Sequence, residues 1–140
     1  MTATALFALV FSAIPLTAGP PPEHEDAIAR HLFPPENVLA HQREIGLDEA
    51  QRRTIREEVV KAQSKFSGLQ IDLQGESEKM AMLLEERPIS EAKVLEEADR
   101  IMGLEREIKK THLALLVRIK NLLSREQQAK LAEINRAGGK

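Results

Sequence analysis

Apolar residues recur at alternating steps of four and three along most of this chain, and this spacing limits the fold more than any other feature. In residues 48–86 one acid, Glu76, occupies the line, which continues past Gly68 and Gly75. Such spacing places the apolar side chains on one stripe of a helix that packs along a partner helix. We expect one long unbroken helix here, with an inward line of Ile55, Val59, Ala62, Phe66, Leu69, Leu73, Met80 and Leu83.

The same spacing returns after a short turn at residues 87–90. Ser90 suits the N-cap position of a helix, and Ile89 with Val94 can form a hydrophobic staple across it. Because the connection is short, the second helix is expected to run antiparallel to the first, which predicts an all-α fold built on a long helical hairpin. Its expected inward line is Val94, Ala98, Ile101, Glu105, Ile108, His112, Leu115, Ile119 and Leu122.

A second apolar line lies beside the first on the return helix. The two lines together make a stripe that is too wide for one partner helix to cover. Either the N-terminal helices fold over it, or a second subunit covers it, or part of it stays open to bind another molecule. The second line consists of Leu95, Met102, Leu113, Leu116 and Leu123.

The start of the chain has the features of an export signal. An apolar run at residues 6–14 is too short to span a bilayer as a helix, and Ala18 supplies a small residue for cleavage. An uncleaved membrane anchor and a truncated start are the alternatives. No other apolar stretch is long enough to cross a membrane, so we expect no stable membrane insertion after the signal is removed.

Short elements are expected between this signal and the hairpin. A prolyl linker leads into a helix that ends at Phe33, and a second helix over residues 37–45 ends at Gly46, a natural C′ residue. The expected boundaries are a signal peptide at 1–18, a linker and short helix at 19–34, the main helical domain at 35–136, and a disordered tail at 137–140.

Composition excludes several classes of function. The formal net charge is −2, and the chain contains neither tryptophan nor tyrosine, so it lacks the basic surface and the stacking side chains of nucleic-acid binding. It also lacks cysteine, which excludes disulfide scaffolds and thiolate chemistry. No Ser/His/Asp arrangement or glycine-rich phosphate loop is visible. We expect neither a nucleic-acid partner nor enzymatic activity.

One five-residue motif occurs twice, at the two ends of the predicted hairpin. A leucine is followed by a small capping residue and, three positions later, by glutamine, which is the arrangement of a capping box. We expect each copy to begin a helix and to anchor a corner by burying its leucine. The motif consists of Leu47, Asp48 and Gln51 in the first copy and of Leu123, Ser124 and Gln127 in the second.

The paired motifs, the hairpin between them and the export signal resemble the periplasmic Spy/CpxP family, which includes ZraP-like and CnrX-like heavy-metal-resistance proteins. The hallmark of that family is a repeated Leu-Thr-x-x-Gln, and here Asp48 and Ser124 replace the threonine. The resemblance covers residues 35–136. It implies a bent hairpin protomer in an intertwined antiparallel homodimer, located in the periplasm.

The resemblance also implies the function. We expect an ATP-independent chaperone or envelope-stress modulator, whose partners are unfolded client proteins or a membrane-bound sensor or anti-sigma partner. The alternative is a heavy-metal sensor that signals to a partner. The expected surface for clients or for the dimer consists of Leu95, Met102, Leu113 and Leu116.

The metal hypothesis depends on His112. Among the four histidines of the chain no pair has the one-turn spacing of a helical metal clamp. His112 falls on the expected inward line, with Glu105 two turns before it, about 10 Å away, so both cannot ligate one ion without help from elsewhere. His112 is therefore either a packed interface residue or a ligand for Zn²⁺, Ni²⁺ or Cu²⁺, and otherwise no cofactor is expected.

Overall fold

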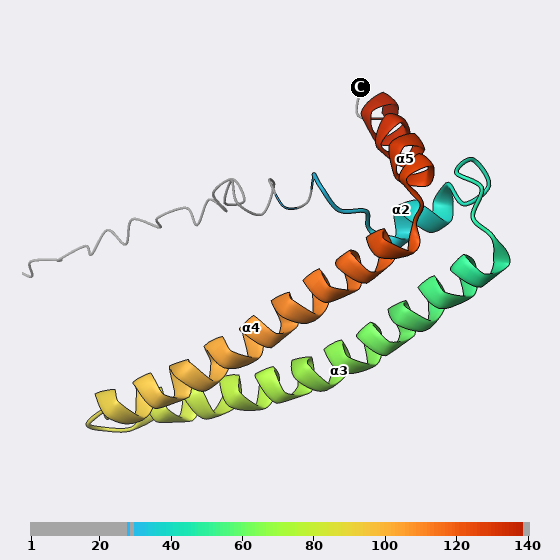
Figure 1. Cartoon of the computed structure of the whole chain (residues 1–140). Helices are drawn as coiled ribbons and strands as arrows, with labels where there is room; N and C mark the ends of the chain where they lie inside the picture. The colour runs from blue at the N-terminus through green and yellow to red at the C-terminus, as the bar shows by residue number, and fades with distance from the viewer. Residues whose placement is uncertain (1–27, 29, 139–140) are drawn as a thin grey trace, which may run out of the picture.

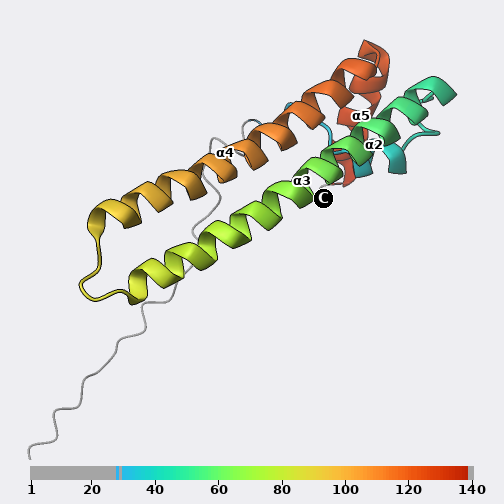
Figure 2. The ribbon, with the colours of Figure 1, turned by 90° about the horizontal axis from the view of Figure 1, so that it is seen from below.

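A computed structural model of the chain describes residue 28 and residues 30–138. Two long antiparallel helices lie side by side as a hairpin, and two shorter ones gather at its open end (Figures 1 and 2). The predicted all-α hairpin is thus confirmed. The helices are α2 (Pro35–Ala40), α3 (Glu49–Glu85), α4 (Glu91–Leu122) and α5 (Arg125–Gly138), and no strand occurs among the described residues.

The predicted inward line of α3 is confirmed. All eight of its apolar residues are buried or half-buried, and Glu76 is half-buried among them. The helix is continuous through Gly68 and Gly75, and a Cβ added at either glycine would meet no atom within 4 Å. Neither glycine therefore marks a break or a close approach of another element.

The predicted inward line of α4 is wrong at two positions. Glu105 and His112 are exposed, whereas Leu104 and Thr111, one residue earlier in each case, face inward. The true stripe also passes through Glu97, which is 2 % exposed. Polar residues can occupy these positions because they have local partners. The Thr111 hydroxyl, for example, donates to its own helix at the Glu107 carbonyl, 2.7 Å away.

The apolar core lies at the open end of the hairpin. Ile55 of α3 and Ile119 of α4 are fully buried there, together with Val38 of α2 and Leu131 of α5. Further along the hairpin, most inward residues beyond Ala62 are only half-buried, because two helices alone cannot enclose their shared stripe. The molecule therefore has a well-packed base and a thin outer half.

The short N-terminal elements differ from the predictions. Ile28 is helical, but residues 30–34 are a turn and irregular chain, so the expected helix does not continue to Phe33, although that ring is buried. α2 ends at Ala40 instead of continuing over 37–45, and a turn over 41–46 follows it. The predicted signal peptide at 1–18 and most of the linker lie outside the described residues.

The two ends of the helical domain are defined by specific contacts. Lys120 donates to the His31 carbonyl at 2.6 Å and lies 5.9 Å over the Phe33 ring, which fixes the entering chain against α4. At the other end α5 continues to Gly138, two residues into the expected disordered tail at 137–140. Among the described helices, none has the length and apolarity that a membrane span needs.

Candidate functional site

Both predicted capping boxes are present, and they form the corners of the molecule. The Asp48 side chain accepts from the Gln51 amide at 2.7 Å, and the Gln51 Oε1 atom accepts from the Asp48 amide at 3.1 Å. Ser124 and Gln127 repeat this exchange at 3.1 and 2.9 Å. The preceding turn ends in the predicted way, because Gly46 has a φ of 69° and closes a Schellman motif.

The two boxes are also bonded to each other. The Gln51 Nε2 atom lies 2.8 Å from the Gln127 Oε1 atom, and the reverse pair is separated by 3.0 Å. The remaining N–H of each amide reaches a carbonyl of the other corner: Gln51 donates to Leu122 at 2.7 Å, and Gln127 donates to Gly46 at 3.0 Å. Each corner therefore makes the same kinds of hydrogen bond to the other, so the two copies of the sequence motif have equivalent contacts in the structure.

The leucines of the motif complete the corners. Leu47 is 6 % exposed and Leu123 is 5 % exposed, as the predicted anchoring role requires. We call the two glutamines and the two leucines the corner lock. Sequence reasoning identified the caps but missed the contact between the glutamines. The sequence did contain an indication of this contact, because the same position of both copies holds glutamine, whose side chain both donates and accepts hydrogen bonds.

Three of the four residues predicted for a client or dimer surface are exposed. Leu95, Met102 and Leu113 are 57, 50 and 41 % exposed, whereas Leu116 is 8 % exposed and belongs to the interior. Val117, 41 % exposed and one helical turn beyond Leu113, was not predicted. We call Leu95, Met102, Leu113 and Val117 the outer face of α4.

The wide apolar stripe of α4 is therefore divided between two environments. Leu116 and Leu123 are covered within the chain, while the outer face of α4 is left open. Met102 and Leu113 line an open hollow of about 340 Å³. The charged residues around this hollow are Glu105, Arg106, Lys109 and Lys110.

The structure does not assemble a metal site around His112. The imidazole is exposed, and its ring centroid lies 6.4 Å from that of Phe66 in a tilted arrangement. Within the described part of the chain, no group of three or more His, Cys, Asp or Glu side chains converges on one point. Binding of Zn²⁺, Ni²⁺ or Cu²⁺ at His112 stays a prediction, and calorimetric titration of the wild type and His112→Ala tests it.

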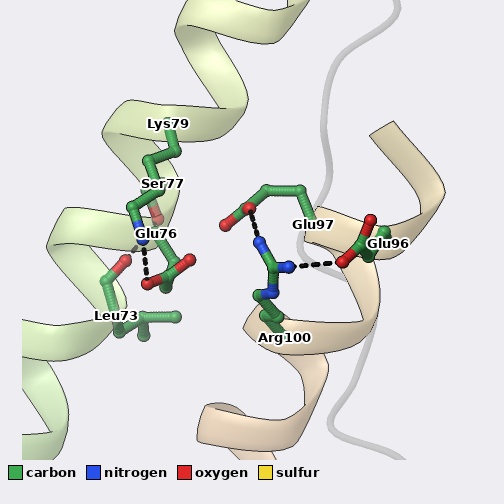
Figure 3. Close-up of polar contacts among 7 residues, drawn as sticks. All are labelled: Leu73, Glu76, Ser77, Lys79, Glu96, Glu97 and Arg100. Atoms are coloured by element: carbon green, nitrogen blue, oxygen red, sulfur yellow. Dashed lines mark hydrogen bonds and ion pairs between the residues drawn. The ribbon is translucent and has the colours of Figure 1, made fainter. Parts of the chain in front are cut away.

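A carboxyl pair in the outer half of the hairpin was not identified from the sequence. Glu76 of α3 and Glu97 of α4 point toward each other across the helix interface (Figure 3). Lys79 lies 2.6 Å from the outer oxygen of Glu76, and Arg100 lies 3.0 Å from that of Glu97. The other two oxygens, Oε2 of Glu76 and Oε1 of Glu97, are buried and accept no hydrogen bond.

Comparison of the chain with models of protein families, with curated proteins and with solved structures finds no match.

Proposed function

We propose that this protein holds unfolded segments of client proteins on the outer face of α4, in the periplasm and without ATP. The observation that carries the proposal is the line of exposed apolar side chains along α4. An extended binding surface without a deep pocket suits clients of varied sequence better than it suits one small ligand.

The dimensions of the outer face fit an extended segment. Leu95 and Val117 are 22 positions apart, which is about 33 Å along a helix. A fully extended peptide of about ten residues covers the same length. The apolar side chains are separated by turns of polar residues, so each anchor contributes modestly and the segment can be released.

The charges beside the hollow give the surface a preference among client segments. Arg106, Lys109 and Lys110 lie next to Met102 and Leu113, together with Glu105. Glu107 is a second acid at this position, because its carboxylate lies 3.5 Å from Lys110. The remaining excess of positive charge favours client segments in which apolar residues are flanked by acids, and it accelerates their encounter at low ionic strength.

An aggregation assay tests this proposal. The mature protein is added at near-stoichiometric ratio to reduced α-lactalbumin, without ATP, and light scattering is followed. The wild type is expected to suppress the scattering, and the triple variant Leu95→Ser, Met102→Ser, Leu113→Ser is expected to lose this effect. Circular dichroism should show the same helix content, because all three side chains are exposed.

A matched control comes from the other helix. Val60, Ile71 and Met82 of α3 are 63, 71 and 61 % exposed, so their triple serine variant removes a similar amount of exposed apolar surface. This control is expected to suppress scattering as the wild type does. Equal loss of activity in both variants would contradict a specific role for the outer face of α4.

The homodimer implied by the resemblance belongs to the same proposal, since a second copy of the chain competes for exposed apolar surface. Sedimentation velocity of the wild type and of both triple variants separates the two uses. We expect a dimer in all three, with client binding lost only in the α4 variant. If the α4 variant alone becomes monomeric, its outer face is a dimer contact and the proposal fails.

A further inference from the structure

The Glu76–Glu97 pair is the most unusual polar feature of the described residues. Glu97 is a charged residue type with only 2 % of its surface exposed, and its partner Glu76 lies within the apolar line of α3. Two buried carboxylate oxygens that face each other without a donor would repel strongly if both groups were ionised. One proton between them would remove the repulsion and supply the missing hydrogen bond.

We propose that Glu76 and Glu97 form a proton-binding site between α3 and α4, which holds the outer half of the hairpin closed when it is occupied and loosens it when both carboxyls ionise. A proton fits this site better than a metal ion does, because Lys79 and Arg100 already bring two positive charges to it. The proposal does not depend on client binding.

The charges around the pair decide which carboxyl holds the proton. From α3, Lys79 bonds to Glu76; from α4, Arg100 is shared between Glu97 and Glu96. Figure 3 shows that Glu97 therefore has to share its cation, whereas Lys79 reaches only Glu76 among the acids drawn. One turn nearer the tip, Lys93 of α4 pairs with Glu86, the C-cap residue of α3, at 3.4 Å.

The pKa directions agree with this geometry. The hydrogen bond that a protonated Glu97 can donate to Glu76, together with the burial of the carboxyl, raises the pKa of Glu97 above its ordinary value of 4.5. The hydrogen bond from Lys79, followed by that from Glu97, lowers the pKa of Glu76. Because the two groups interact, these directions describe the order in which the pair loses its protons.

The pair makes the stability of the outer half depend on pH. Since the pKa of Glu97 is raised in the folded chain, the stabilisation from its proton is complete below pH 4.5 and is lost as the pH rises through the raised pKa. The lowered pKa of Glu76 acts in the opposite direction, and its contribution is lost as the pH falls through that lowered value. The contact is strongest between the two pKa values.

Titration by carbon NMR tests the site directly. The side-chain carboxyl carbon of Glu97 is followed with pH in the wild type and in Glu76→Gln. We expect the Glu97 midpoint to lie above 4.5 in the wild type and to move toward 4.5 in the variant, because the first cause of the shift is removed. A wild-type midpoint at or below 4.5, or a midpoint that Glu76→Gln leaves unchanged, would overturn the proposal.

Hydrogen exchange tests the consequence for the hairpin. Glu97→Gln keeps a donor toward Glu76 at every pH, so at pH 7.5 its amides in 73–83 and 94–104 should exchange at least about twofold more slowly than in the wild type, with the difference vanishing at pH 4.5. Glu105→Gln removes the same charge from an exposed position on α4 and should change neither segment. Equal exchange in the wild type and Glu97→Gln at pH 7.5 would contradict the closing role.

Discussion

Gln51 and Gln127 use every hydrogen-bonding position of their side-chain amides. Each Oε1 atom accepts twice and each Nε2 atom donates twice, within one corner and across to the other. The helix starts could be predicted from the sequence because a capping box is local. The contact between the boxes could not, because it depends on the relative placement of residues 76 positions apart.

Replacing Gln51 by glutamate removes both donated bonds and places a carboxylate against the Leu122 carbonyl and the Gln127 oxygen. We expect Gln51→Glu to lower the free energy of unfolding by about 2–4 kcal/mol in urea denaturation at pH 7. Gln63→Glu, the same change at an exposed position of α3, should stay within about 0.5 kcal/mol. Equal effects of the two variants would mean that the corner lock contributes nothing specific.

The buried leucine of the second corner gives a second prediction. Leu123→Asp places a charge in the core, and we expect the melting temperature to fall by about 10 °C. Leu84→Asp makes the same substitution at a side chain that is 50 % exposed, and it should change the melting temperature by less than about 2 °C. A shift below about 2 °C for Leu123→Asp would contradict its anchoring role.

At the level of elements, the two long helices were predictable to different degrees. In α3 the inward line is apolar except at Glu76, so the periodicity alone gave its register. In α4 seven of the nine predicted positions are buried or half-buried, but the strict alternation of four-residue and three-residue steps places Glu105 and His112 inward. The residues that face inward there are Leu104 and Thr111, and a polar residue such as Thr111 or Glu97 gives no apolar signal by which the sequence could correct the register.

Two glycines in different settings give predictions of opposite sign. Gly68 lies in the helical interior of α3 with open space around it, so Gly68→Ala should raise the free energy of unfolding by about 1 kcal/mol. Gly46 has a φ of 69°, which is unfavourable for a residue with a side chain, so Gly46→Ala should lower the free energy of unfolding by about 1–2 kcal/mol. Urea denaturation measures both, and a destabilising Gly68→Ala would show that α3 needs flexibility there.

The uneven core predicts uneven protection along the hairpin. Amides in 52–62 and 112–122 lie beside the base core, whereas those in 68–80 and 98–108 have few buried neighbours. We expect hydrogen exchange at pH 7 to be at least about tenfold faster in the outer segments. Uniform protection along both helices would indicate that a further contact, such as a second subunit, covers the outer half.

At the scale of the molecule, the corner lock and the base core fix the angle at which the hairpin leaves the short helices (Figure 1). The outer half then extends away from the core with apolar side chains exposed on both helices. Which molecule contacts those exposed side chains could not be predicted from the sequence of one chain, because that contact depends on the partner as well. The proposed binding of clients on α4 can be measured directly because of the composition of the chain.

Because the protein has neither tryptophan nor tyrosine, the tryptophan fluorescence of a client reports binding without background. Reduced α-lactalbumin is titrated with the wild type, with the α4 triple serine variant and with the α3 triple serine variant. We expect a saturable blue shift with the wild type and the α3 variant, and affinity at least about tenfold weaker with the α4 variant. The same affinity for both variants, or no shift with the wild type, would contradict client binding on the outer face of α4.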